Sequence, residues 1–199
     1  METTVAISNM SELSKKLSKK LARTCGILSK LRHLLPTKVL VCLYNSLFVS
    51  FLSYGIVVWG HTFPSYIDPI LKLQKRAVRI ISHQLVHSNS AAIFRSLHLL
   101  RITEIFQMKV LVFVYESINK ISPSCFHNFF QTNSSIHHHL TRQADRGDLF
   151  KTKWKTVCFG RRSILHLGPD LWNNLPPSLK KSSNKQSFKT NIKIHLLNQ

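Results

Sequence analysis

The stretch Val39–Gly60 places the tightest limit on the fold, because it contains no charged residue. An uncharged segment of this length can cross a bilayer as a helix. It is interrupted by Gly55, however, and it carries four polar residues, Asn45, Ser46, Ser50 and Ser53. As a helix it would have an apolar stripe made of Leu40, Leu43, Tyr44, Leu47, Phe51 and Tyr54. We therefore predict a pair of buried helices, and we keep a small basic membrane protein with one span at about 39–60 as the alternative.

The chain is strongly basic, with 28 Lys and Arg against 8 Asp and Glu, which gives a formal net charge of +20. Hydrophobic residues make up 44% of it, which is enough for a packed core and excludes a simple basic tail. Because such an excess of one sign repels itself in a compact protein, it favours a polyanionic partner. We expect that partner to be nucleic acid, with an anionic membrane as the less favoured candidate.

The acids are too sparse and scattered to indicate a metal-dependent enzyme. Magnesium-assisted phosphoryl transfer uses clustered carboxylates, and only Asp145 and Asp148 lie close together in a polar stretch. We interpret these two as solvated loop acids. The run 137–139, with His127 and Cys125 upstream, could hold a metal, but a solvated loop is the favoured interpretation. We expect no catalytic residue, no metal and no cofactor.

Four cysteines are widely separated in the sequence, at Cys25, Cys42, Cys125 and Cys158. Their spacing indicates neither a zinc ribbon nor a secreted disulfide framework. Cys25 and Cys42 stand in apolar helical patterns, so we expect them to be core thiols. Residues 1–11 are mixed and polar, unlike a secretory signal peptide. We expect an intracellular protein, in the nucleus or cytoplasm, and not a secreted one.

The N-terminal part predicts a basic amphipathic helix that begins with a cap at Asn9 and Glu12 and ends at Pro36. Its apolar residues recur at helical spacing, and its other faces carry Lys15, Lys16, Lys19, Lys20 and Arg23.

Another helix, following Pro64, has the most informative charge pattern. Its apolar face is made of Ile67, Ile70, Leu71, Ala77, Val78 and Ile81. Its basic residues follow an i, i+3, i+4, i+7 spacing, at Lys72, Lys75, Arg76 and Arg79. Only Asp68 lies near this stripe in sequence, one turn before Lys72. The stripe is therefore a candidate for following a phosphate backbone, and solvation of a surface helix is the alternative.

The rest of the chain predicts a short helix over 90–100 and a long buried helix from a cap at Thr103 to Asn119. Composition changes from Ser122, where a stretch rich in Ser, Asn, Gln and His begins. Beyond it we predict two short strands over 155–159 and 162–167, a turn at Gly168–Pro169, and a hydrophobic cluster of Leu171, Trp172 and Leu175. A last helix, capped by Ser183 and Gln186, would bury Phe188, Ile192 and Leu196. The predicted fold is thus mainly α: a helical bundle over 1–121, then a loop-rich basic region over 122–199 with a short β-hairpin and a terminal helix.

Five blocks of the sequence stand out, taken in order: SKKLARTCGILSKLRHLLPTKVLVCLYNSLFVSFLSYGIVVWG (18–60), IDPILKLQKRAVRII (67–81), HLTRQ (139–143), FGRRSILHLGPDLWNNLPPSLK (159–180) and the SFK helix (187–189). Together they resemble the reverse transcriptases of non-LTR retrotransposons, the jockey-like long interspersed elements. The resemblance runs from about Leu13 to Leu197 and corresponds to the region that follows the palm in that family.

This resemblance implies a helical thumb over 1–121 that contacts the template–primer duplex. It also implies that the palm, with its Tyr/Phe-x-Asp-Asp motif, and the endonuclease are missing, since no adjacent Asp pair occurs in this chain. The expected protein is a non-catalytic fragment that binds RNA, DNA or an RNA–DNA hybrid without reading its sequence. A missing palm domain is a further possible partner, and an exposed apolar surface would favour self-association.

The resemblance and the charge pattern together select candidate binding residues. The first group is Lys72, Lys75, Arg76 and Arg79, and the second is Arg142, Arg161 and Arg162, which lie in the TRQ and GRRS blocks. For Tyr54, Trp59 and Trp172 we expect packing rather than base stacking.

Overall fold

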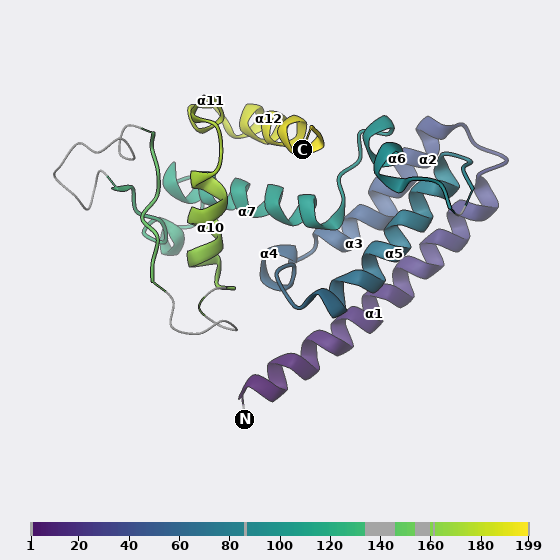
Figure 1. The fold of residues 1–199 in the computed structure, drawn as a ribbon, viewed down its shortest axis with the longest axis horizontal. Helices are drawn as coiled ribbons and strands as arrows, with labels where there is room; N and C mark the ends of the chain where they lie inside the picture. The colour runs from purple at the N-terminus through teal and green to yellow at the C-terminus, as the bar shows by residue number, and fades with distance from the viewer. Residues whose placement is uncertain (1, 86, 134–145, 154–159, 161, 199) are drawn as a thin grey trace. The chain divides into compact units, whose positions relative to one another are not determined.

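The computed structural model of the chain describes residues 2–85, 87–133, 146–153, 160 and 162–198, with side chains from residue 10 onward. It is mainly α-helical, which confirms the predicted fold class (Figure 1). The chain divides into two compact units, residues 1–106 and 107–199. The division falls inside helix α7 (Ile102–Ile118), whereas the boundary predicted from composition, at residue 121, falls just after that helix.

The first unit is built from helices that precede α7. They are α1 (Glu2–Leu31), α2 (Thr37–Tyr44), the π-helical η1 (Asn45–Val49), α3 (Ser50–Ser53), α4 (Ile56–Trp59), α5 (Pro64–Ile81) and α6 (Ser90–Ser96). Helices α1 and α5 pack side by side (Figure 1). The Ser14 hydroxyl donates to the Tyr66 carbonyl oxygen at 2.8 Å, and the Cys25 thiol donates to the Leu73 carbonyl oxygen at 3.6 Å. Because both contacts advance in the same order along the two helices, α1 and α5 run parallel.

Helix α1 extends further toward the N-terminus than the sequence predicted. It begins at Glu2, so Asn9 lies within the helix and its predicted role as the cap is wrong. It ends at Leu31 rather than at Pro36, because the chain turns where the backbone N–H groups of Leu34 and Leu35 both donate to the Leu31 carbonyl. Proline then restricts the residue before it to an extended conformation, which prevents the helix from continuing. The buried side of α1 includes Leu17, Leu21, Cys25 and Leu28, as periodicity predicts.

The uncharged stretch forms α2, η1, α3 and α4 rather than one long helix. Within the described residues, no helix is both long enough and apolar enough to span a bilayer. Five of the residues it buries are spaced by four, at Leu40, Tyr44, Phe48, Leu52 and Ile56, and Trp59 is buried as well. The predicted stripe is wrong at Phe51 and Tyr54, which are exposed. A π turn bonds i to i+5 and holds more residues than an α turn, so it rotates the following side chains away from the face that an α-helical period of about 3.6 predicts.

Helix α5 has the predicted apolar face, and a polar side chain lies within it. Its buried residues include Ile67, Ile70, Ala77, Val78 and Ile81, together with Gln74, which is fully buried. Helix α6 buries Ile93 and Phe94, and the Asn89 side chain caps it by accepting from the Ala91 N–H at 3.0 Å.

Helix α7 is largely buried, as predicted, with Val110, Leu111 and Val114 inaccessible to solvent. It begins at Ile102, so Thr103 lies in its first turn and does not cap it. The N-terminal N–H groups are bound by other side chains: Gln74 Oε1 accepts from Ile102 N at 2.9 Å, and Glu104 accepts from Arg101 N at 2.8 Å. Since the first N–H groups of a helix lack partners within it, these two bonds replace the predicted cap.

The second unit packs short helices around the rest of α7. They are the 3₁₀ turn η2 (Ser124–Phe126), α10 (Ile164–Asn173), α11 (Pro177–Lys180) and α12 (Lys185–Leu197). The predicted strand over 162–167 is wrong, because Ile164–Leu167 begin α10, while the predicted strand over 155–159 lies outside the described residues. Ser163 caps α10 by accepting from the Leu165 N–H at 3.3 Å. The β structure of the described chain is a single bridge between Thr132 and Leu149.

Gly168 and Pro169 lie inside α10, so the turn predicted for them is wrong. A side chain at Gly168 would place its Cβ 2.8 Å from Phe130 and 3.0 Å from Val114. This glycine therefore serves the close approach of α10 to its neighbours. Helix α12 buries Phe188, Ile192 and Leu196 as predicted, but its cap is Asn184, which accepts from the Ser187 N–H at 2.7 Å, and not Ser183.

Candidate nucleic-acid interface

The basic stripe of α5 forms on the side of the helix opposite its buried face. Lys72 and Arg76 are exposed, whereas Lys75 and Arg79 are half-buried. The Arg79 Nε donates to the Ser88 carbonyl oxygen at 3.1 Å, so this guanidinium is partly held by the segment before α6. The sequence thus predicted the helix and its stripe correctly, and the structure adds that the four cations differ in accessibility.

The positive charge of the α5 stripe is not neutralised by carboxylates of the described chain. The ion pairs of those residues involve α1, α7, α10 and the C-terminal helices, and none of them includes Lys72, Lys75, Arg76 or Arg79. Asp68, the acid nearest in sequence, is exposed to solvent. An uncompensated row of cations raises the local concentration of polyanions through a favourable potential.

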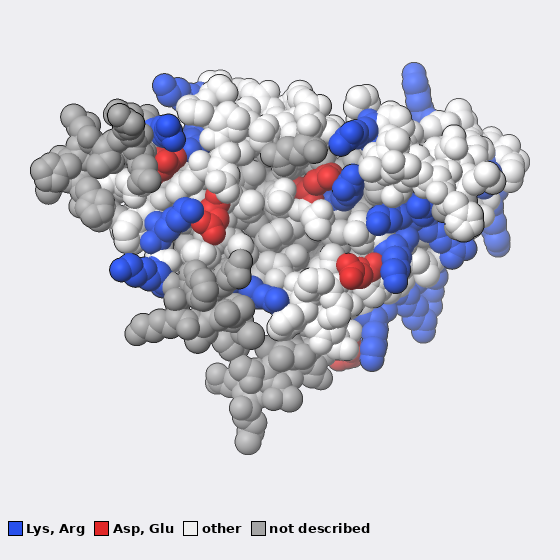
Figure 2. Space-filling model, in the orientation of Figure 1, with Lys and Arg blue, Asp and Glu red and all other residues white. Residues whose placement is uncertain are grey.

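Helix α1 adds a second set of exposed cations, to which the sequence argument assigned no binding role. They are Lys15, Lys16, Lys19, Lys20, Arg23 and Lys30. Lys and Arg side chains gather over α1 in the space-filling view (Figure 2). Lys16 Nζ pairs with Glu12 Oε1 at 2.6 Å, but both side chains are more than half exposed, so water screens this pair.

Helices α1 and α5, which carry these two sets of cations, pack against each other within the first unit. Burial raises the pKa of the Cys25 thiol to about 11, and the nearby positive charge of Arg76 partly opposes that rise. Arg76 of α5 thus lies close enough to α1 to act on a side chain there.

The expectation of a core thiol holds for Cys25, whereas Cys42 is exposed and that expectation is wrong for it. The α1 cations could have been chosen from the sequence, since their spacing leaves them off the leucine face.

The second group of candidate residues belongs to the other unit. Arg142 and Arg161 lie outside the described residues, and Arg162 is half-buried just before α10. Arg162 also has a polar or electrostatic partner, so it is not a freely available cation.

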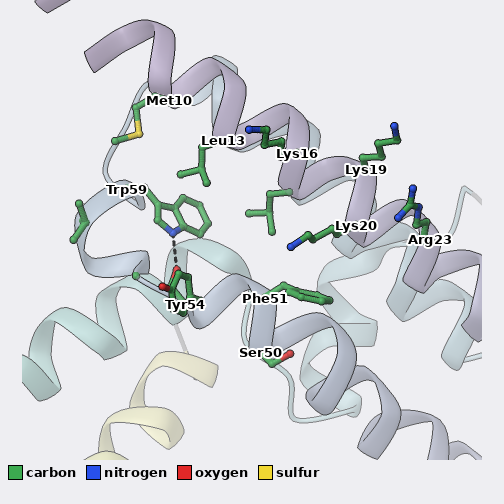
Figure 3. A pocket seen from close by; sticks show the side chains of 13 residues that line it. Met10, Leu13, Lys16, Lys19, Lys20, Arg23, Ser50, Phe51, Tyr54 and Trp59 are labelled. Carbon is green, nitrogen blue, oxygen red and sulfur yellow. Dashed lines mark hydrogen bonds between the residues drawn. The ribbon is translucent and has the colours of Figure 1, made fainter. Parts of the chain in front are cut away.

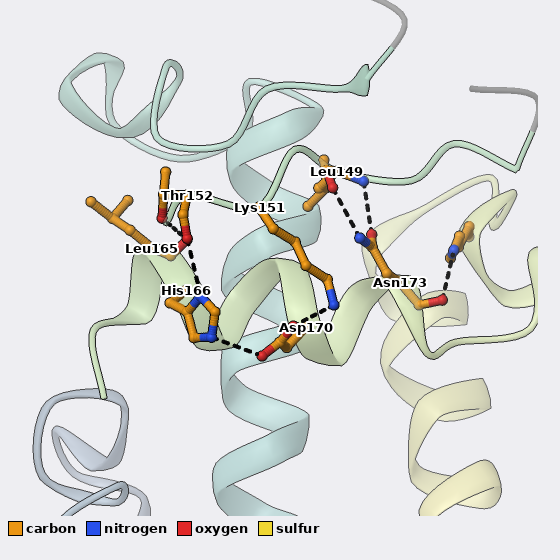
Figure 4. A network of polar contacts seen from close by, with 8 residues as sticks. Leu149, Lys151, Thr152, Leu165, His166, Asp170 and Asn173 are labelled. Carbon is orange, nitrogen blue, oxygen red and sulfur yellow. Dashed lines mark hydrogen bonds and ion pairs between the residues drawn. The ribbon is translucent and has the colours of Figure 1, made fainter. Parts of the chain in front are cut away.

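A polar network occupies the region around α10, where the sequence predicted solvated loop acids and a β-hairpin (Figure 4). The Asn173 side chain accepts from Leu149 N at 2.8 Å and donates to the Leu149 carbonyl at 2.9 Å. Asp170 pairs with Lys151 at 2.5 Å and with His166 at 3.2 Å. These contacts fix the segment 147–152 against α10, which is a structural role.

Asp148 is buried and pairs with Lys180 at 2.6 Å, so its interpretation as a solvated loop acid is wrong. The side chains of this pair are 10% and 5% exposed, respectively. Removing one partner of such a pair leaves a buried charge uncompensated, which makes the pair a constraint on the local fold. Asp145, the other acid of this stretch, lies outside the described residues.

Two of the three aromatic residues pack as expected. Trp172 is buried against Phe188, and its indole N–H donates to the Gly147 carbonyl at 3.0 Å. Trp59 is also buried and donates to the Tyr54 carbonyl at 2.9 Å. Tyr54 itself is 86% exposed, so the expectation that it packs in the core is wrong.

Among the residues that the structure describes, no three His, Cys, Asp or Glu side chains come together as a metal site. The histidine run 137–139 lies outside those residues. The fold and the charge distribution together describe a basic, mainly helical protein with exposed cations on α1 and, within the described residues, a row of cations on α5 that has no carboxylate partner. Comparison with protein-family models, curated proteins and solved structures gives no match.

Proposed function

We propose that this chain is part of a non-LTR retrotransposon reverse transcriptase and that it binds template–primer nucleic acid without catalysing its extension. The five ordered sequence blocks support the family assignment, and the mainly helical fold is compatible with a thumb. The absence of an adjacent Asp pair from the sequence supports a non-catalytic role. A palm domain from elsewhere would then be a partner, and the exposed apolar residues of the first unit are available for it or for a second copy.

The observation that carries the binding proposal is the row of cations on α5, which has no carboxylate partner among the described residues, together with the exposed cations of α1, the helix packed against α5. The α5 stripe runs over eight residues, from Lys72 to Arg79, whose Cα atoms span about 10 Å at the helical rise, so it can reach a few phosphates of a duplex strand. Lysine and arginine contacts to phosphates fix position and carry no sequence information. A thumb that must hold any template–primer requires this kind of contact.

The experiment is a titration of a fluorescently labelled RNA–DNA duplex at several salt concentrations, comparing the natural chain with K72Q/K75Q/R76Q/R79Q. Each neutralised phosphate contributes about 0.9 to the slope of log affinity against log salt on B-form DNA. We expect the variant to reduce that slope by up to about three units, with Arg79 contributing least because Ser88 already holds it. Fluorescence anisotropy provides the affinities, and circular dichroism tests whether the variant keeps its helices.

A matched control removes the same charge from exposed positions of the second unit, in K120Q/K181Q/K189Q/K193Q. We expect it to change the slope by less than one unit. Equal effects of the two variants would show that net charge, and not the α5 stripe, drives binding. An affinity that hardly depends on salt would contradict phosphate contact altogether.

A further inference from the structure

A groove of about 850 Å³ opens between α1 and the segment of α3 and α4 in the first unit (Figure 3). Its apolar lining includes Leu13 and Leu17 from α1 and Phe51, Tyr54, Val58 and Trp59 from the other side. Its edge on α1 carries Lys16, Lys19, Lys20 and Arg23. In the close view, Leu13 faces Trp59, and Lys20 reaches toward Phe51. The groove therefore combines an apolar floor with a cationic rim.

The floor is exposed because of how the uncharged stretch folds. The π turn η1 directs Phe51 and Tyr54 outward, and Gly55, at a φ of +60°, separates α3 from α4. Leu13, Phe51, Tyr54 and Val58 are 40%, 38%, 86% and 69% exposed. A single exposed apolar residue is ordinary, whereas several that line one groove mark an interaction site.

Two polar side chains along the floor already have partners within the protein. The Trp59 indole N–H donates to the Tyr54 carbonyl at 2.9 Å, and the Ser50 hydroxyl donates to the Ser46 carbonyl. The floor therefore presents mainly apolar surface to a ligand, to which the exposed Tyr54 side chain adds a hydroxyl group. This chemistry suits the apolar face of a helix, whose backbone groups are satisfied internally.

The rim determines the charge of the ligand. All four of its side chains are cationic and exposed, and Lys20 Nζ lies 5.3 Å from the centre of the Phe51 ring. Glu12, which lies outside the groove, pairs with Lys16 at one end, whereas none of the ion pairs among the described residues involves Lys19, Lys20 or Arg23. A ligand with acidic side chains beside its apolar face would match both parts of the groove.

We propose that this groove binds an amphipathic helix of a partner protein, with the helix's apolar face on the floor and its acidic flank along Lys16, Lys19, Lys20 and Arg23. The α1 side of the groove, from Met10 to Arg23, is about 20 Å long, which corresponds to about four helical turns. A second copy of this chain fits less well, because a protein of net charge +20 repels its own copy at a cationic rim. Nucleic acid fits less well too, because the floor is partly aliphatic and Lys20 lies over the Phe51 ring.

The test uses the full chain and a labelled synthetic helix of about four turns, with leucines on one face and glutamates beside them. There are two comparison peptides. One has the same composition in scrambled order, and the other has glutamine in place of each glutamate. Anisotropy should show binding of the acidic amphipathic helix, with at least tenfold weaker binding of each comparison peptide. Val58→Asp should weaken binding at least tenfold, because it places a hydrated carboxylate in the apolar floor. That carboxylate has the same sign of charge as the glutamates of the peptide. Lys20→Gln with Arg23→Gln should weaken it and flatten its salt dependence.

The matched control is Leu34→Asp, since Leu34 is 76% exposed, is aliphatic and lies outside the groove. It changes the charge as Val58→Asp does and should leave peptide binding unchanged. Equal loss in both variants, or equal binding of the scrambled peptide, would overturn the proposal. The proposal would also be overturned if sedimentation showed a dimer of the natural chain that Val58→Asp dissociates. The same holds if an oligonucleotide displaced the peptide and bound the Val58→Asp variant more weakly than the natural chain. The α5 glutamine variant keeps the groove, so its peptide binding separates this proposal from the nucleic-acid proposal.

Discussion

Gln74 joins three separate segments of the first unit through one fully buried amide. Its Nε2 donates to Tyr44 Oη at 2.8 Å and to the Leu100 carbonyl at 3.0 Å, and its Oε1 accepts from Ile102 N at 2.9 Å. Burial raises the pKa of Tyr44, although the bond from Gln74 opposes this rise, so the phenol stays neutral at physiological pH. The bonds connect α2, α5 and the start of α7. Losing any one of them would leave a buried polar group without a hydrogen-bond partner.

We expect Gln74→Ala to lower the free energy of unfolding by about 2–4 kcal/mol, because it creates a cavity and leaves buried donors and acceptors unpaired. Gln74→Met keeps most of the side-chain volume and removes only the hydrogen bonds. It should lower the free energy of unfolding by about 1–3 kcal/mol. Gln186→Ala changes an exposed glutamine of α12 and should have little effect. Urea unfolding followed by circular dichroism measures all three. A Gln74→Met protein as stable as the natural one would show that the bonds contribute nothing.

The buried residues of a helix could be predicted from periodicity where one face is apolar and the other charged. The same prediction failed where every residue is uncharged. The apolar face of α5 and the buried residues of α12 follow directly from a period of about 3.6. In the uncharged stretch no charge marks the outer face, so nothing in the pattern indicated the π turn at Asn45–Val49. The groove depends on that turn, and this is why a candidate phosphate site on α5 could be predicted from the sequence but the groove could not.

Caps were the other element-scale error, for a related reason. Ser, Thr, Asn and Asp are all favourable N-caps, and several of them stand near most predicted helix starts. Asn184 caps α12 where Ser183 was predicted, and α7 starts at Ile102, where Gln74 Oε1 accepts its first N–H. A contact between residues 28 positions apart is fixed by tertiary packing, so local sequence cannot reveal it.

Two glycines of the first unit should respond in opposite directions to replacement by alanine. Gly26 lies within α1, and an added Cβ would meet no atom within 4 Å, so Gly26→Ala should stabilise the protein by about 0.5–1 kcal/mol through helix propensity. Gly55 has a φ of +60°, and its added Cβ would meet Trp59 at an ordinary 3.9 Å. Gly55→Ala should therefore destabilise by about 1–2 kcal/mol through backbone strain alone. Thermal unfolding of the two variants checks the signs, and stabilisation by Gly55→Ala would contradict the left-handed break between α3 and α4.

At the scale of the whole molecule, eight carboxylates can neutralise at most eight of the 28 lysines and arginines. The remaining charge is a cost to the folded state, because like charges lie closer together in it than in the unfolded chain. A polyanionic partner removes this cost on binding. The same imbalance therefore links the stability of the free protein to its proposed function.

We expect the free protein to become more stable as salt rises from about 0.01 M to about 0.15 M, because the screening length falls from about 30 Å to about 8 Å over that range. A gain of about 1 kcal/mol would raise the midpoint of thermal unfolding by about 2–4 °C in a chain of this size. Calorimetry in sodium chloride and in sodium fluoride measures the rise and separates screening from anion binding. The α5 variant K72Q/K75Q/R76Q/R79Q and its control K120Q/K181Q/K189Q/K193Q each remove four charges, so both should show a smaller rise. The rise of the unfolding midpoint with salt should be similar for the two variants, because stability responds to the total charge. The salt slope of duplex binding should differ between them, because phosphate contact depends on where the charges lie. A midpoint that falls with salt would mean that attractive ion pairs outweigh the repulsion.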